Sequence, residues 1–334
     1  MNRIGAFITV LSFLGGCASR EAMNSVDLDP GQLPPPDITL NIPGLGPCTD
    51  NPDRSLRFDS SQPVNVLVHG CFGSSGEFRG LAQVLAFHGQ QSACFTYDDR
   101  AKLTHSATDL RRAVKQLAEQ SHLPQITVIG HSMGALIARN ALIESPPTPL
   151  PGHPVNLRLV TISGPFAGIE SARTCGNVWL YPLTLGFVPL SCYLITGPKW
   201  ADITYSSRFI REPGTLARQV ISYLKIDTDE RGTCRREEGG RCVEDDNIFS
   251  LAEQRNSLVE TDSRFRRVEV NAGHVEIVGD KRVAPKKLIA ILQDQGVLRP
   301  TAPGRLSAFS LLLTRIYQDD ELQLRATLKS RSQP

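Results

Sequence analysis

A serine between small residues is the first feature of this chain that could do chemistry. The segment Gly130-His131-Ser132-Met133-Gly134 follows an apolar run at 126–130 and precedes a helical run at 135–144. A serine at such a tight strand-to-helix turn is strained and exposes its hydroxyl, and small neighbours avoid collisions with nearby backbone. The start of the following helix favours negative charge that develops there. Ser132 is therefore the candidate nucleophile.

A serine becomes nucleophilic only when a base takes its proton, and histidine does so near neutral pH. Of seven histidines, His274 follows the later strands, in the loop NAGH between an expected strand at 265–270 and an expected helix at 284–292. We predict His274 as the base. The other six lie inside motifs, before the nucleophile or in a proline-rich turn: His69, His88, His105, His122, His131 and His153.

These segments resemble the lipase and esterase branch of the α/β-hydrolase family. The likeness rests on GHSMG after ITVI and on the earlier run VNVLVHGCF, and it spans roughly residues 63–294. It implies acyl ester cleavage by a triad in the chain order serine, acid, histidine, without a metal or organic cofactor. It also implies two backbone N–H donors to the attacked carbonyl oxygen, those of Cys71 and Met133.

The acid behind the histidine is predicted to be Asp246. It lies 28 residues before His274, which leaves room for one helix and one strand, and 250–259 and 265–270 supply both. The run Asp246-Asn247-Ile248 also resembles the acid turn of bacterial lipases. The alternatives that stay open, all near the end of the preceding strand or its insertion, are Asp229, which lies 45 residues before His274, Asp227 and Asp245.

The elements that must position these residues alternate between strand and helix patterns. This alternation predicts an α/β fold with a mainly parallel sheet and helices on both faces. The family resemblance implies that this is the α/β-hydrolase fold, which we expect over residues 48–300. Two insertions interrupt it, a cap at about 165–213 and a charged, glycine-rich segment at about 227–244. The expected strands lie in apolar runs at 64–69, 93–97, 126–130, 157–163, 219–226 and 265–270.

Residues 1–16 resemble a bacterial lipoprotein signal peptide. Arg3 precedes an apolar stretch at 4–14 that is too short to span a bilayer, and Leu14-Gly15-Gly16-Cys17 resembles a lipobox. We predict lipid attachment at Cys17; an ordinary secretory signal with a chance cysteine is the alternative. A tether at 17–47 would then link the membrane anchor to the domain, which places the protein in the bacterial cell envelope, facing the periplasm or in the outer membrane.

The eight cysteines are expected to form disulfides, because export leads to an oxidising compartment. Cys71 is expected to pair with Cys48 or Cys94, or to stay a free thiol. No short-spaced cysteine pair joins a histidine pair, so no metal site is predicted. The two staples that we predict, each within one insertion, are Cys234–Cys242 and Cys175–Cys192.

The balance of charge gives no support to nucleic-acid binding. Lysine plus arginine number 36 and aspartate plus glutamate number 34, so the net charge is +2.

The carboxyl-terminal tail at 301–334 has an apolar stripe formed by Phe309, Leu312, Leu313 and Ile316. We expect it to pack on its own domain, with membrane or partner contact as the alternative.

The sequence therefore predicts a serine hydrolase that cleaves carboxylic esters of a small molecule or lipid. An acyltransferase that uses the same triad is one alternative. A non-catalytic envelope lipoprotein on a hydrolase scaffold is the other.

Overall fold

The computed structural model describes residues 28–71, 73–145, 150, 155–169, 199–280 and 283–317. Several predicted features lie outside these residues. They are the targeting segment with Cys17, most of the predicted cap with Cys175 and Cys192, and the end of the predicted tail.

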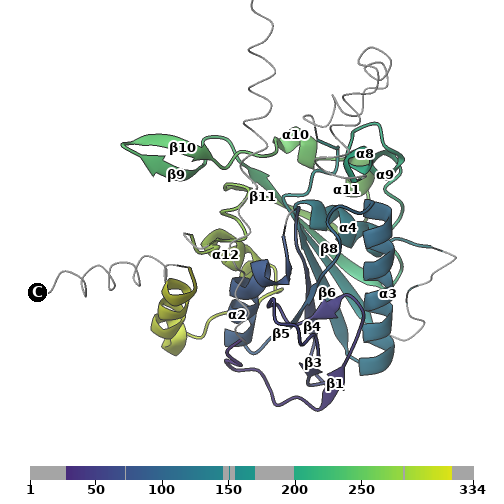
Figure 1. Ribbon diagram of the computed structural model, residues 1–334, viewed down its shortest axis with the longest axis vertical. Helices are drawn as coiled ribbons and strands as arrows, with labels where there is room; N and C mark the ends of the chain where they lie inside the picture. The colour runs from purple at the N-terminus through teal and green to yellow at the C-terminus, as the bar shows by residue number, and fades with distance from the viewer. Residues whose placement is uncertain are drawn as a thin grey trace, which may run out of the picture.

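A seven-stranded sheet forms the centre of the molecule, in the order β11-β8-β7-β6-β4-β5-β2 (Figure 1). All neighbours pair in parallel except β2 and β5, which pair antiparallel. The strands are β2 (Leu45–Gly46), β4 (Val64–Val68), β5 (Gln91–Phe95), β6 (Gln125–His131), β7 (Asn156–Ile162), β8 (Val220–Asp229) and β11 (Phe265–Asn271).

Helices cover both faces of this sheet, as the alternation of strand and helix patterns predicts (Figure 1). One core lies between the sheet and the helices α3 (Leu103–Ser121) and α4 (Met133–Ala141). The other lies between the sheet and the helices α2 (Arg79–Phe87), α12 (Lys286–Asp294) and the helix at 306–317. Because both faces are covered, all five residues of β4 are buried, and four of the five are apolar. The exception, Asn65, donates from Nδ2 to the Gln91 carbonyl oxygen at 3.1 Å.

The register of the parallel strands brings their carboxyl ends to one edge. Val68 pairs with Gly130, and Ile162 pairs with His131 on the next strand. On the far side of β7, Asn271 of β11 lies opposite Asp229 of β8. The loops that carry the candidate residues therefore leave the sheet at the same edge.

Short elements surround the sheet. The strands β1 (Ile38–Leu40) and β3 (Leu56–Phe58) form an antiparallel pair, and β9 (Cys234–Glu238) and β10 (Arg241–Asp245) form a hairpin closed by the disulfide Cys234–Cys242. Figure 1 shows this hairpin extending away from the sheet. The remaining short helices are η2 (Ser75–Phe78), α8 (Lys199–Asp202), α9 (Arg208–Arg211), α10 (Leu251–Gln254), α11 (Ser257–Glu260) and η4 (Pro303–Arg305).

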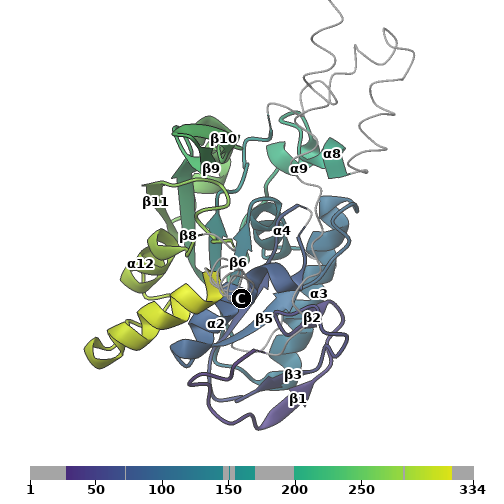
Figure 2. The ribbon, with the colours of Figure 1, turned by 60° about the vertical axis from the view of Figure 1, so that its left-hand side comes forward.

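The helix at 306–317 packs on the domain by its apolar stripe. The Phe309 ring packs against that of Phe87 at the end of α2, with centroids 5.1 Å apart, and Leu312 and Leu313 are buried in the same core. Figure 2 shows this helix, in yellow, beside α2 and α12. Within the described part of the chain, no helix combines the length and apolar character needed to cross a bilayer.

Candidate active site

Ser132 lies at the turn between β6 and α4. Its backbone has φ 56° and ψ −126°, a region that residues other than glycine avoid, and its N–H donates to the carbonyl oxygen of Ile162 at 2.9 Å. Such a conformation costs on the order of 1–3 kcal/mol and persists only where the surrounding structure imposes it. The sharp turn that GHSMG predicts is present, and it holds the serine at the carboxyl edge of the sheet.

Three glycines permit the close approach of backbone segments around Ser132. A Cβ atom on Gly134 would lie 2.3 Å from the carbonyl oxygen of His69, and one on Gly130 would lie 2.3 Å from the carbonyl oxygen of Gly134. A Cβ atom on Gly70 would lie 3.1 Å from the Ser132 Cβ. The loop that follows β4 therefore runs directly beside the serine.

This loop is fixed from the side of β5. The Tyr97 hydroxyl donates to the His69 carbonyl oxygen at 2.8 Å, and the two rings stack with centroids 4.3 Å apart. Burial lowers the pKa of His69, which favours the neutral imidazole. Cys48 and Cys94 are bonded to each other, which excludes the expected pairing of Cys71 with either of them. The Cys71 thiol accepts a hydrogen bond from Nζ of the buried Lys199 at 3.0 Å. The predicted role of Cys71 in stabilising the oxyanion depends only on its backbone N–H.

His274 lies in the loop between β11 and α12, as the sequence predicts, and its Nδ1 atom meets two side chains. Oε1 of Glu230 lies 2.9 Å away, and Oγ of Ser163 lies 2.9 Å away. Glu230 directly follows β8, and Ser163 directly follows β7. Since β8 and β11 are parallel neighbours, the residues after their carboxyl ends emerge side by side. Nδ1 is therefore engaged, which leaves Nε2 to exchange a proton.

The Glu230 carboxylate is buried and accepts hydrogen bonds at both oxygens. Oε2 accepts the N–H groups of Ile248 at 2.6 Å and Phe249 at 2.7 Å. Oε1 accepts the hydroxyls of Ser163 at 2.8 Å and Thr228 at 2.9 Å, in addition to the imidazole. Burial by itself raises the pKa of Glu230, but the imidazole and these donors outweigh it, so the pKa lies below its ordinary value. The carboxylate is therefore held in its charged form.

Asp246, the acid predicted from spacing, meets the backbone of the histidine loop instead of the imidazole. Its carbonyl oxygen accepts the N–H of His274 at 2.9 Å. Its carboxylate accepts the N–H of Val275 at 3.0 Å and that of Glu276 at 3.0 Å. Burial raises the pKa of Asp246. The carboxylate that meets the imidazole is that of Glu230, and Asp246 shapes the turn that carries the histidine.

The three alternative aspartates also point elsewhere. Asp229 pairs with the exposed Arg231 at 2.6 Å, and this hydrogen bond lowers the pKa of Asp229. Asp227 is buried against Lys225 in a separate ion pair. Asp245 accepts a local backbone N–H in the turn that follows β10.

Sequence reasoning missed Glu230 because it compared only aspartates and ended the strand at residue 226. The strand β8 runs on to Asp229, so Glu230 is the first residue beyond it. The position of Glu230 could have identified it. It follows the strand that precedes β11 in the sheet, and the α/β-hydrolase family accepts glutamate as well as aspartate as the acid.

Two aromatic rings pack around the histidine. The His131 Nε2–H donates to the His274 carbonyl oxygen at 2.9 Å, and the two imidazole centroids lie 4.7 Å apart. Phe249 meets the His274 ring edge-on at 4.8 Å. Burial lowers the pKa of His131 well below its ordinary value, so His131 stays neutral. His131 therefore links the serine turn to the histidine loop.

Among the described residues, the hydrogen bonds of the His274 ring go to Glu230 and Ser163, and none joins the ring to Ser132. A nucleophile and its base are often farther apart without substrate than in the reacting complex. No group of three or more histidine, cysteine, aspartate or glutamate side chains that could hold a metal ion occurs in the described residues. The arrangement offers a strained serine, an imidazole with Nε2 available and a buried carboxylate behind it, the components of nucleophilic acyl transfer.

Comparisons with known proteins agree with this architecture. Residues 63–163 match the family model described as alpha/beta hydrolase fold. No curated protein matches the chain.

Among the solved structures that the chain resembles at low identity are two esterases and a lipase. Esterase B from Lactobacillus rhamnosis is 12% identical, with 95% of this chain and 96% of that chain covered and a TM-score of 0.48. The mature Bacillus licheniformis lipase BlEst2 is 15% identical, with 79% and 99% covered and a TM-score of 0.45. The Pyrococcus furiosus esterase Pf2001 is 17% identical, with 83% and 97% covered and a TM-score of 0.42. With its mostly parallel sheet flanked by helices, the chain has the α/β-hydrolase fold, which confirms the predicted fold class.

Proposed function

We propose that this protein is a serine hydrolase that cleaves carboxylic esters, with Ser132 as nucleophile, His274 as general base and Glu230 as the acid behind the histidine. The observation that carries the proposal is the 2.9 Å contact between Oε1 of the buried Glu230 and Nδ1 of His274. The loop that carries His274 is joined to the strained Ser132 turn by the hydrogen bond from His131. It supports a histidine fixed with Nδ1 protonated and Nε2 ready to accept a proton.

The reaction proceeds in two acyl transfers. His274 Nε2 takes the proton of Ser132 as Oγ attacks the ester carbonyl carbon, and the imidazolium returns that proton to the departing alcohol. Water activated by the same imidazole then releases the acid from the acyl-enzyme. The backbone N–H groups of Cys71 and Met133 would stabilise the oxyanion, and loss of one such donor typically costs about 3 kcal/mol.

The nucleophile is tested by treating the purified protein with a fluorophosphonate probe and by assaying p-nitrophenyl esters of increasing chain length. We expect the wild type to be labelled and active and Ser132→Ala to be neither. The matched control is Ser61→Ala, because Ser61 lies in an exposed turn before β4 and makes no contact with Glu230 or His274; it should be labelled and active like the wild type. Labelling that persists in Ser132→Ala, or a wild type that takes up no label, contradicts the proposal.

The acid is tested by Glu230→Gln against Asp246→Asn. The N–H groups of Ile248 and Phe249 require an oxygen at the Oε2 position, so a glutamine would turn its NH₂ toward His274 Nδ1. That orientation imposes the wrong imidazole tautomer, which lowers kcat about ten-thousandfold in a serine triad. Asp246→Asn keeps one acceptor oxygen for the loop, and we expect a loss of about tenfold. The opposite ranking would refute the assignment of Glu230.

Lipid anchoring remains a proposal from the sequence. The segment Leu14-Gly15-Gly16-Cys17 supports acylation of Cys17, which would bring the enzyme to a membrane surface. We expect the full chain to fractionate with membranes and Cys17→Ala to appear in the soluble fraction.

The alternative activity, acyl transfer by the same residues, would be detected as transfer of the acyl group to an added alcohol during the ester assay.

A further inference from the structure

We propose that Ser163 is a positioning residue of this site, whose hydroxyl fixes the Glu230–His274 pair and the tautomer of the imidazole. The proposal rests on the proposed function and adds a residue that never meets substrate. Ser163 has no exposed surface, and it stands at the carboxyl end of β7 as Ser132 stands at that of β6. The two serines thus follow neighbouring strands of the sheet.

Backbone strain marks both positions. Among the described residues, three other than glycine have positive φ: His122 at the end of α3, Ser132 at 56° and Ser163 at 47°. The Ser163 N–H is held by the carbonyl oxygen of Ile226 on β8 at 2.9 Å. Strain of this kind costs on the order of 1–3 kcal/mol and gathers at functional sites. At Ser163 it turns Oγ toward the imidazole, a direction that an ordinary continuation of β7 would not give.

Every hydrogen-bonding position of the Ser163 hydroxyl is used. Its proton goes to Glu230 Oε1 at 2.8 Å, because an ionised carboxylate can only accept. Its oxygen lies 2.9 Å from His274 Nδ1 and 2.7 Å from Thr228 Oγ1, whose one proton is shared between Ser163 Oγ and Glu230 Oε1. Because the ionised Glu230 carboxylate can only accept and also lies 2.9 Å from Nδ1, this arrangement favours a proton on Nδ1.

Thr228 is itself held in place at the far end of this chain. Gln254 is fully buried, accepts the Thr228 N–H at 2.8 Å and donates to the Thr228 carbonyl oxygen at 2.7 Å. The hydroxyl of Thr228 is therefore presented to Ser163 by a rigid backbone. Since partly satisfied buried polar networks are costly, removal of one member should be felt by the others.

The test compares Ser163→Gly with Ser163→Ala. Both remove the hydroxyl, but glycine relieves the strain at φ 47° while alanine retains it, so the two differ in stability and agree in chemistry. We expect both to lower kcat about tenfold to a hundredfold, with KM unchanged because Ser163 does not contact substrate. We expect Thr228→Val to lower kcat in the same direction, and Thr228→Ser, which keeps the hydroxyl, to restore it.

A spectroscopic readout separates positioning from packing and needs no substrate. In protein labelled with ¹⁵N-histidine, the Nδ1-bound proton of His274 should give a downfield resonance that is lost in His274→Gln. We expect that proton to exchange faster with water in both Ser163 variants. Wild-type kcat together with an unchanged resonance in Ser163→Gly and Ser163→Ala would overturn the proposal. An unlabelled wild type would instead overturn the nucleophile itself.

Discussion

Removal of the Cys48–Cys94 disulfide should destabilise the protein more than removal of the hairpin disulfide. The first joins residues 46 positions apart and the second joins residues 8 apart. The chain-entropy model then gives about 4 kcal/mol for Cys48–Cys94 and about 2.5 kcal/mol for Cys234–Cys242. Cys48 and Cys94 are also buried in the core, so their loss cannot be absorbed by local opening.

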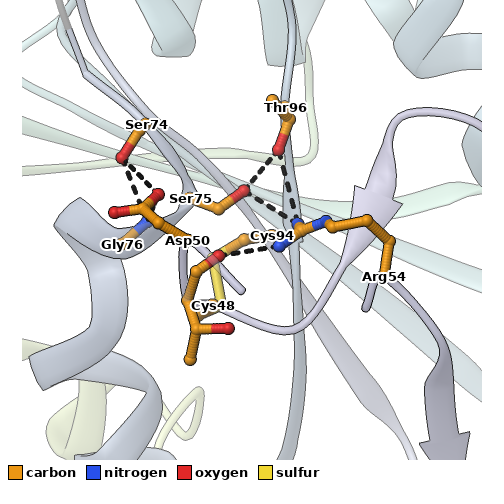
Figure 3. Close-up of a disulfide and its surroundings, with 9 residues drawn as sticks. Cys48, Asp50, Arg54, Ser74, Ser75, Gly76, Cys94 and Thr96 are labelled. Carbon is orange, nitrogen blue, oxygen red and sulfur yellow. Dashed lines mark hydrogen bonds between the residues drawn. A yellow bond between two sulfur atoms is a disulfide. The ribbon is translucent and has the colours of Figure 1, made fainter. Parts of the chain in front are cut away.

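The same disulfide fixes the segment that supports the loop beside Ser132 (Figure 3). The Asp50 carboxylate accepts the hydroxyl of Ser74 at 2.9 Å and the N–H of Gly76 at 3.2 Å. Arg54 donates to Ser75 Oγ at 2.9 Å. These bonds hold the start of η2, which continues from the predicted oxyanion loop. Loss of Cys48–Cys94 should therefore lower activity as well as stability.

The assay is urea unfolding followed by circular dichroism, with kcat/KM measured on the folded protein. We expect Cys48→Ala/Cys94→Ala to lose about 4 kcal/mol of unfolding free energy and to lower kcat/KM about tenfold. The matched control, Cys234→Ala/Cys242→Ala, should lose at most about 2.5 kcal/mol and keep its activity. Equal destabilisation by the two pairs, or full activity in the first variant, would refute the reasoning.

Two further predictions concern the serine turn. Gly134→Ala should lower the unfolding free energy by about 3 kcal/mol and abolish most of the activity, because its Cβ would strike the His69 carbonyl oxygen. The control Gly304→Ala, which has open space around it, should change the unfolding free energy in urea by less than about 0.5 kcal/mol. The unfolding free energy should also fall as the pH drops from about 7 to 5. Burial lowers the pKa of His131 in the folded protein, so over this pH range only the unfolded chain binds a proton at His131. The unfolding free energy then changes by at most about 1.4 kcal/mol per pH unit. His131→Gln should show a shallower slope, and an identical slope in the variant would assign the effect to other groups.

The fold and the serine turn could be predicted from sequence because both are local patterns. Apolar runs of strand length between helical repeats indicate a parallel sheet without knowledge of strand order. The glycines of GHSMG are needed because the start of α4 packs closely against both β6 and the end of β4, and the residue types of the motif show this need directly. Neither inference depends on contacts between distant segments.

The acid could not be found in this way because its identity depends on register. Asn271 lies opposite Asp229, and only this pairing brings Glu230 beside the histidine loop. A count of residues from Asp246 to His274 gave room for the right elements but no side-chain direction. The Cys48–Cys94 pairing was equally hidden, since it depends on the two-residue strand β2 lying antiparallel to β5.

The helix at 306–317 sets a practical limit on shortened versions of this protein. It lies beyond the stretch of sequence that the strand and helix patterns assign to the domain, yet Phe309 and Tyr317 complete the interior next to α2. A fragment ending near residue 300 would expose Phe87 and its neighbours to water and invite self-association. Expression plasmids should therefore encode the chain at least through Tyr317.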